Sequence, residues 1–126
     1  MKRTLLLTAL LAGCGQPQAG SVILNFPADW VTDGILHAAV FESGRCATLA
    51  SPVPLEEALV RLSDPSNFNA QNERQMTLSA IPAGRDRMVV AVIEKDGQQV
   101  CRACADELVI NDGEQSAARL ILEGCP

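Results

Sequence analysis

Short runs of strand-forming residues, separated by residues typical of turns, recur along this chain and constrain its fold more than any other feature. No apolar face with helical spacing continues over several turns, so the pattern predicts strands and not long helices. A chain of 126 residues is long enough for one domain and too short for two. We therefore expect an all-β domain, an antiparallel β-sandwich of about seven strands. The expected strands span residues 21–26, 35–41, 74–81, 88–94, 98–101, 107–110 and 117–122.

Two Asp-Gly pairs mark the tightest expected turns. Asp96-Gly97 and Asp112-Gly113 each separate two expected strands, and glycine adopts the positive φ that hairpin turns require. These turns predict a meander of hairpins in the second half of the chain. Residues 55–62 carry leucines at the spacing of one helix face, which predicts a short helix or an edge strand. Residues 64–72 are polar and rich in turn formers, so we expect a long surface loop there.

The first thirteen residues have the composition of an export signal. Lys2 and Arg3 are basic, and residues 5–11 form an apolar run that is too short to span a bilayer. The tetrapeptide Leu11-Ala12-Gly13-Cys14 that ends this run resembles the lipobox of bacterial lipoproteins. The resemblance implies cleavage before Cys14, a thioether-linked diacylglycerol on its sulfur and a further acyl chain, such as palmitate, on its amine. An ordinary cleaved signal followed by an incidental cysteine is the alternative.

The resemblance also implies a place in the cell. Lipid chains on Cys14 would anchor the protein to a membrane of the cell envelope, since two or three chains hold a protein stably. Gly15 stands where an Asp is associated with retention at the inner membrane, which favours the outer membrane. Residues 14–20 lack apolar periodicity and predict a lipidated N-terminus with a flexible tether, which reaches about 20 Å at about 3.4 Å per residue. The expected domain covers residues 21–126.

Acidic residues outnumber basic ones. The chain has 10 Lys and Arg against 15 Asp and Glu, and cleavage before Cys14 removes Lys2 and Arg3, which leaves 8 basic residues and a formal net charge of −7. Such a surface repels phosphate backbones and anionic head groups, and no run of Lys or Arg makes a local exception. We therefore expect no nucleic-acid partner. The expected partners are the membrane, through the lipid on Cys14, and a protein of the cell envelope.

The middle of the chain carries a second resemblance. Residues 76–84, Met-Thr-Leu-Ser-Ala-Ile-Pro-Ala-Gly, are followed by Arg85-Asp86-Arg87 and the apolar run 88–93. This block resembles prealbumin-like or carboxypeptidase-regulatory-like sandwich modules, in which a Pro-x-Gly turn leads from one sheet to the other. The resemblance covers residues 35–122 and implies a scaffold, an adhesive unit or a ligand-display domain without catalytic residues. An immunoglobulin-like topology would produce a similar pattern, and both topologies stay open.

Four cysteines remain once Cys14 is assigned to the lipid: Cys46, Cys101, Cys104 and Cys125. An even number in an exported domain predicts two disulfides. Cys101 and Cys104 also have the C-x-x-C spacing of a thiol-disulfide oxidoreductase, which is the alternative function. The pair follows an expected strand without a βαβ context, which disfavours this alternative. A zinc site of four thiolates is a further alternative, although structural zinc sites usually contain two close pairs of cysteines.

Strand register favours one of the three possible cysteine pairings. The apolar residues of strands 107–110 and 117–122 share a side of the sheet when the numbers of opposed residues sum to 226. Leu108 then faces Ala118, and the same ladder places Cys101 opposite Cys125, within the reach of a disulfide.

The other predicted bridge, Cys46–Cys104, follows from the same register. Cys104 lies three residues after Cys101 and therefore on the opposite face of the strand. Its expected partner is Cys46, in a bridge between the two sheets. An unbroken strand would bury Asp106 on the same face as Cys104, which counts against this register. A bulge or break near Ala105 would relieve the burial of Asp106, and it would also shift the parity on which the pairing rests.

The remaining polar residues do not form a recognisable catalytic set. His37 is the one histidine, in the middle of an expected strand, and no G-x-S-x-G motif presents a serine, so we expect no enzymatic activity and no cofactor. Asp64, Asn67 and Asn69 place oxygen atoms in one loop but lack the spacing and glycine of an EF-hand, which predicts a solvated turn without metal. Arg85-Asp86-Arg87 is expected to be a polar connection between strands or a charged contact surface.

Overall fold

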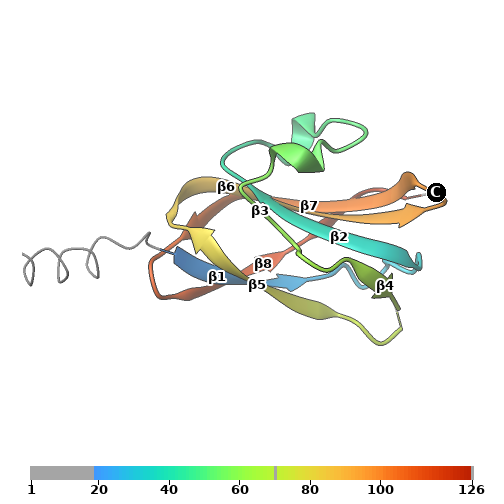
Figure 1. The fold of residues 1–126 in the computed structure, drawn as a ribbon, viewed down its shortest axis with the longest axis horizontal. Coiled ribbons are helices and arrows are strands. Elements are labelled where there is room, and N and C mark those ends of the chain that lie inside the picture. Colours follow the sequence, from blue (N-terminus) through green and yellow to red (C-terminus); the bar gives the residue numbers. More distant parts are fainter. Residues whose placement is uncertain (1–18, 70, 126) are drawn as a thin grey trace, which may run out of the picture.

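The computed structural model of this chain describes residues 19–69 and 71–125 and shows a β-sandwich of two sheets (Figure 1). The predicted all-β class is confirmed. Two single turns of 3₁₀ helix, η1 (Cys46–Thr48) and η2 (Leu55–Glu57), lie between β2 and β3. No helix in the described part of the chain is long and apolar enough to cross a membrane. The strands are β1 (Ala19–Asn25), β2 (Gly34–Phe41), β3 (Val60–Arg61), β4 (Ser66–Phe68), β5 (Gln75–Pro82), β6 (Gly84–Lys95), β7 (Gln98–Ile110), β8 (Gln115–Arg119) and β9 (Ile121–Gly124).

The smaller sheet contains three strands in the order β5-β1-β8. Its central strand, β1, runs antiparallel to β5 and parallel to β8. Gly20, Val22 and Leu24 of β1 are buried, and the residues between them are partly exposed. This alternation is typical of a strand that packs one of its two faces against a core. The smaller sheet therefore has one buried face and one face toward solvent.

The larger sheet is buried on both faces. Its strands follow the order β3-β2-β6-β7-β9, and β4 pairs with the beginning of β2. Residues 87–93 of β6 are all buried, without the alternation seen in β1. A continuous apolar run of this kind is typical of a strand that is covered from both sides.

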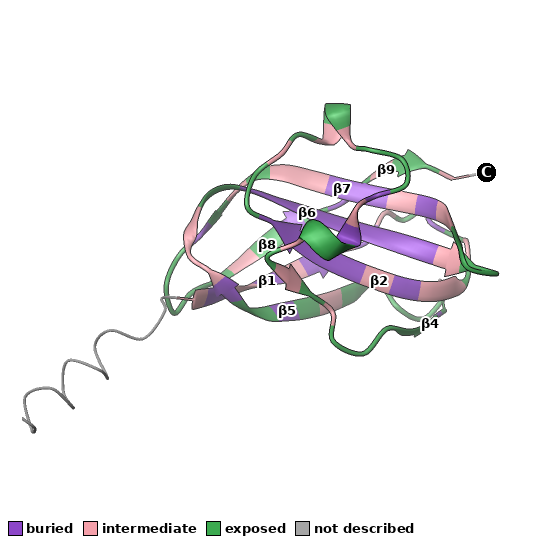
Figure 2. Cartoon of the chain, turned by 45° about the horizontal axis from the view of Figure 1, so that its top comes forward, coloured by how far each residue is buried: buried purple, intermediate pink, exposed green. Residues whose placement is uncertain are grey.

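Two apolar clusters account for this burial. The inner cluster fills the space between the sheets and includes Val89 and Ile93 of β6. The outer cluster includes Val90 of β6 and Val53. Val53 lies in residues 42–59, the segment between β2 and β3. We call residues 42–59 the cover segment, because they lie over the outer face of the larger sheet (Figure 1). Figure 2 shows the buried residues concentrated along the strands beneath this segment.

One of the two predicted hairpins forms. Asp96 and Gly97 have φ angles of 52° and 77°, as both central residues of a type I′ turn do, and β6 and β7 pair on either side of them. The hairpin predicted at Asp112-Gly113 is wrong. Gly113 has the expected positive φ of 73°, but β8 leaves the larger sheet and pairs with β1. A tight turn reverses the chain locally and does not decide which strand the next segment joins.

Several predicted strand boundaries also need correction. The expected strands 98–101 and 107–110 are one continuous strand, β7, whereas the expected strand 117–122 is divided into β8 and β9 around Leu120. The predicted facing of Leu108 and Ala118 is wrong, because Ala118 faces Leu24 of β1. Opposed residue numbers sum to 226 only at Arg102 and Gly124, and the register shifts immediately after this pair.

β7 is irregular near Ala105, where a bulge would relieve the burial of Asp106. Val89 of β6 faces Ala105, whereas Arg87 faces Leu108, so β7 contains one more residue than β6 between these pairs. Glu107 has a φ of 57° within this bulge. The bulge changes which residues of β7 point inward. The shift in register toward β9 is a separate irregularity, between Arg102 and Ala103.

Three further expectations about the ends of elements are corrected. β1 begins at Ala19, so the tether expected over residues 14–20 ends earlier, and the rest of it lies outside the described residues. Of the short helix or edge strand expected at residues 55–62, the helix is reduced to the single turn η2, because the backbone becomes extended at Ala58, and the edge strand forms as β3 beside β2. The expected loop 64–72 contains β4, which is held in place by Phe68, a side chain only 2% exposed.

Candidate binding pocket

The cysteines of the described chain form the two disulfides that strand register predicted, Cys46–Cys104 and Cys101–Cys125. Cys101 belongs to the inner apolar cluster and Cys104 to the outer one, so their side chains lie on opposite faces of β7. A thiol-disulfide exchange site and a zinc site of four thiolates both require these two sulfurs side by side. In the structure each of these two sulfurs is instead bonded to a cysteine elsewhere in the sequence, Cys104 to Cys46 and Cys101 to Cys125.

The Cys46–Cys104 bridge differs from the expected one in what it connects. It joins the cover segment to the outer face of the larger sheet, and not one sheet to the other. The reason is that Cys104 faces Val90 of β6, on the side of the sheet that points away from β1. The N–H of Cys46 also donates to Oδ2 of Asp106 at 2.8 Å. The cover segment thus supplies the partner for the carboxylate that a regular strand would have buried.

Polar side chains of β7 fix the rest of the cover segment. The side-chain amide of Gln99 accepts from the N–H of Val53 at 2.7 Å and donates to the carbonyl of Val53 at 3.0 Å. Nη1 of Arg102 donates to the carbonyl of Ala50 at 2.7 Å. The cover segment has little regular structure of its own, so these side chains satisfy backbone groups that would otherwise be left unpaired near the sheet.

His37 forms a contact between neighbouring strands. Its Nε2 lies 3.3 Å from Oε1 of Glu94, and the two side chains belong to β2 and β6. The His37 side chain is 17% exposed. Cross-strand pairs of this kind contribute to sheet stability, which gives the histidine a structural explanation.

The three residues of the predicted solvated turn lie in or beside β4, with Asp64 exposed before it. Asn67 lies in β4 and faces Ile35 of β2. Oδ1 of Asn69 accepts a hydrogen bond from the N–H of Gln71 at 3.0 Å, which closes its own turn. Within residues 19–69 and 71–125, no group of three or more His, Cys, Asp and Glu side chains is placed to hold a metal ion.

The segment Arg85-Asp86-Arg87 belongs to β6 and is not a connection between strands. Arg85 and Asp86 are exposed, but Arg87 is buried. The Arg87 guanidinium donates to the carbonyl oxygens of Pro82 at 3.2 Å, Ala83 at 2.8 Å and Glu42 at 3.0 Å. Arg87 therefore ties the end of β5 and the beginning of the cover segment to β6.

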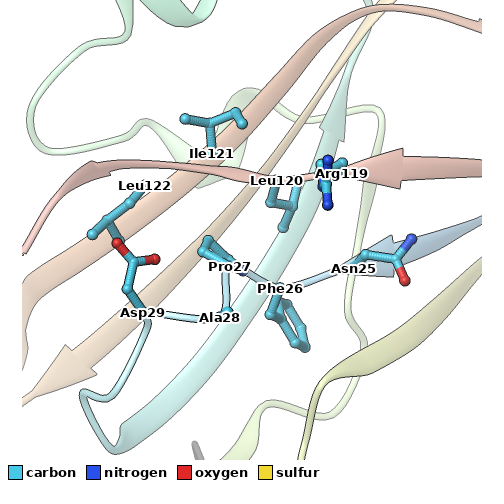
Figure 3. A pocket seen from close by; sticks show the side chains of 9 residues that line it. All are labelled: Asn25, Phe26, Pro27, Ala28, Asp29, Arg119, Leu120, Ile121 and Leu122. Atoms are coloured by element: carbon cyan, nitrogen blue, oxygen red, sulfur yellow. The ribbon is translucent and has the colours of Figure 1, made fainter.

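An open pocket of about 810 Å³ lies where β1 and β8 separate at one end of the sandwich. The N–H of Leu120 donates to the carbonyl of Asn25 at 2.9 Å, and Pro27 has no N–H with which to continue the ladder. Beyond this point the chain after β1 and the chain after β8 diverge. Residues 25–29 form one wall of the pocket and residues 119–122 form the other (Figure 3).

The lining of this pocket combines apolar side chains with two opposite charges. Figure 3 shows Asp29 and Arg119 toward opposite ends, with Pro27 and Leu120 between them. Ile121 is 56% exposed at the rim. The described residues that line the pocket place one carboxylate, Asp29, and one guanidinium, Arg119, beside apolar side chains. This combination suits the binding of a partner with an apolar body.

Aromatic packing supports one wall of the pocket. The ring of Phe26 meets those of Trp30 and Phe68 edge to face, with centroid distances of 5.5 Å and 5.3 Å. Sequence analysis did not predict this pocket. The available signals were Pro27, directly after a strand, and the apolar run 120–122, which continues past the point where β8 ends.

Comparisons with protein-family models, with curated proteins and with solved structures found no match for this chain.

Proposed function

We propose that this chain is a lipid-anchored protein of the bacterial cell envelope, whose β-sandwich has a binding or structural role without catalysis. The observation that carries the proposal is Leu11-Ala12-Gly13-Cys14 at the end of a short apolar run. The two disulfides support export, because disulfides persist in oxidising compartments. Since the other four cysteines pair with one another, Cys14 is the cysteine that remains for a lipid.

The start of the domain is compatible with close attachment to a membrane. Four residues separate Cys14 from Ala19, the first residue of β1. A chain of this length reaches about 17 Å at about 3.4 Å per residue. The N–H of Ala19 donates to Oδ1 of Asp112 at 3.1 Å, and the carbonyl of Ala19 accepts from the N–H of Gly113 at 2.8 Å. The proposal therefore places the turn after β7 at the end of the domain nearest the membrane, and Gly15 favours the outer membrane.

The pocket between residues 25–29 and 119–122 is the candidate site for the binding role. Its mixed lining, with apolar side chains and one charge toward either end, suits a segment of an envelope protein better than a nucleic acid, which the formal charge of −7 would repel. A ligand-display or scaffold role also agrees with the resemblance to prealbumin-like modules.

Cell fractionation of the full-length chain and its Cys14→Ser variant tests the anchor. We expect the wild-type chain in the membrane fraction and the variant in the soluble fraction or as an uncleaved precursor, because serine cannot carry the thioether. Gly15→Ser is the matched control, one residue further along, and should stay with the membrane. Identical fractionation of all three chains, with the Cys14→Ser chain cleaved to the same size as the wild type, would contradict the proposal.

A further inference from the structure

The outer edge of β5 is unusual among the strand edges of the described residues. One edge of β5 pairs with β1, and no described strand pairs with the other. All eight residues of β5 are uncharged. The other edge strands are shorter: β8 has five residues and ends in Arg119, β9 has four and includes Glu123, and β3 and β4 have two and three. Natural edge strands are commonly protected by charges or short length, and β5 has neither protection.

The hydrogen bonds between β1 and β5 show which backbone groups of β5 are unpaired. The N–H of Phe26 donates to the carbonyl of Arg74 at 2.9 Å, so these residues form a hydrogen-bonded pair at the start of the ladder. Hydrogen-bonded and non-hydrogen-bonded pairs alternate along an antiparallel ladder. Thr77, which faces Ile23, is therefore in a non-hydrogen-bonded pair. The N–H and carbonyl groups of Gln75 and Thr77 therefore point toward the free edge, and Ser79 directly follows Leu78, the last residue of the regular register.

An irregularity limits the part of β5 that is available. The register with β1 shifts between Leu78 and Ile81, and Ala80 has a φ of 58°. Pro82, which has no N–H to donate, follows. A bulge and a proline both prevent further pairing at an edge. The regular stretch is therefore residues 75–79, and Thr77 lies at its centre.

We propose that two copies of this chain associate through this stretch, β5 against β5 in antiparallel orientation around a two-fold axis at Thr77. Thr77 of one copy then faces Thr77 of the other, and Gln75 of each faces Ser79 of the other. Each of these pairs exchanges two backbone hydrogen bonds, which join the two three-stranded sheets into one. In this register odd-numbered residues face odd-numbered ones and even-numbered residues face even-numbered ones. The buried face of one sheet therefore continues into the buried face of the other.

Charge and symmetry favour a second copy in this orientation over a parallel one. Arg74 directly precedes β5, and parallel pairing would place the two Arg74 side chains together. In the antiparallel dimer they lie at opposite ends of the contact, about 20 Å apart along the strands, which exceeds the screening length of about 8 Å in physiological salt. In a two-fold contact both copies use the same surface, so the free edge of β5 is sufficient and no second surface is required.

On the inner face, the dimer places Met76 of each copy opposite Leu78 of the other. Met76 is partly buried against the inner cluster, whereas Leu78 is buried within it. Pairing would bury the exposed remainder of Met76 and extend the apolar row of the smaller sheet across the contact. The inference uses no part of the argument for a lipid anchor, so the two proposals fail independently.

Cysteine crosslinking of the full-length chain, with Cys14→Ser in every variant so that the new cysteine is the only one outside the two disulfides, tests both the dimer and its register. In the Thr77→Cys variant the new cysteines face each other with Cα atoms about 5.5 Å apart, which is within disulfide reach. We expect a disulfide-linked dimer on a non-reducing gel after mild oxidation. Gln75→Cys is the matched control on the same edge and the same face, and its two copies lie about 14 Å apart along the strands. It should remain monomeric.

Three results would contradict this inference. One is the absence of a Thr77→Cys dimer in a sample whose peptide map shows the two native disulfides intact. The second is equal crosslinking of Thr77→Cys and Gln75→Cys, which indicates random collision. The third is crosslinking of Thr77→Cys to a chain of a different mass, which indicates an extended segment of another protein at this edge.

Discussion

The guanidinium of Arg87 connects β6 to the turn after β5 and to the start of the cover segment. It bonds to two carbonyls at the turn from β5 to β6 and to one at the start of the cover segment. Gly84 makes room for it, because a Cβ at Gly84 would lie 2.6 Å from Cζ of Arg87. Backbone carbonyls at a turn between sheets have no strand partner, so a buried donor with several N–H groups is needed there.

We predict that Arg87→Met destabilises the protein by about 2–4 kcal/mol, because it keeps the apolar stem and leaves three carbonyls without their donor. Urea unfolding of the full-length chain provides the measurement. Trp30 is the one tryptophan and is fully buried, so its fluorescence reports the loss of the inner core. Arg85→Met, an exposed arginine two residues earlier, should change the stability by no more than about 0.5 kcal/mol. Equal effects of the two variants would show that the buried hydrogen bonds contribute nothing.

Individual residues differ in how far sequence predicted their environment. The alternation of faces along a strand was sufficient to separate Cys101 from Cys104. The Cys101–Cys125 pair was predicted from a ladder that is wrong at Leu108 and Ala118 and holds at Arg102 and Gly124, directly beside the bridge. The same reasoning did not predict the burial of Arg87, because its carbonyl partners come from turns whose positions depend on the whole fold. The predicted pairing of Cys104 with Cys46 is correct. The predicted location of this bridge, between the two sheets, is wrong, because it joins the larger sheet to the cover segment.

Among the elements, the cover segment depends most on contacts outside itself. Its only regular structure is two 3₁₀ turns, and it is held by Val53 and Leu55 in the outer cluster, by Gln99 and by the disulfide to Cys104. The apolar runs 38–41 and 88–93 were the available sequence signals for a sheet covered on both faces. Sequence analysis interpreted these runs as ordinary strands and did not predict a covering layer.

We predict that the double variant Cys46→Ser, Cys104→Ser releases the cover segment while the two sheets stay assembled. The chain-entropy model assigns about 4 kcal/mol to this bridge, which spans 58 residues, and about 3.5 kcal/mol to Cys101–Cys125, which spans 24. Because these values are similar, stability alone does not distinguish the bridges. Hydrogen exchange measured by mass spectrometry does, since each bridge protects a different part of the chain.

Peptides from residues 42–59 should exchange faster in the Cys46→Ser, Cys104→Ser variant, whereas peptides from β1 should keep their protection. The control is Cys101→Ser, Cys125→Ser, in which faster exchange should appear near β9 and not in the cover segment. Faster exchange spread evenly over both sheets in the first variant would show that the bridge supports the whole fold and not the cover.

At the scale of the molecule, local patterns predicted the fold class better than the topology. Strand alternation and the Asp96-Gly97 turn each depend on residues that are close together in the sequence. These local features could therefore be predicted, and together they indicate a β-sandwich. The partner of β8 is decided by contacts with β1, more than 90 residues earlier in the chain, as in the bond from Asn25 Nδ2 to the carbonyl of Ala118 with a separation of 93 residues. The pocket was missed for the same reason, since its two walls are residues 25–29 and 119–122.

The anchor is the central proposal for the whole molecule, and the mass of the N-terminal peptide tests it most directly. After Cys14, the next basic residue is Arg45, so trypsin releases residues 14–45 as one peptide that contains none of the disulfide-bonded cysteines. We predict that this peptide, taken from the full-length chain produced in bacteria, begins at Cys14 and carries the mass of a diacylglyceryl group and a further acyl chain. A peptide that begins elsewhere, or that begins at Cys14 without lipid, would contradict the account.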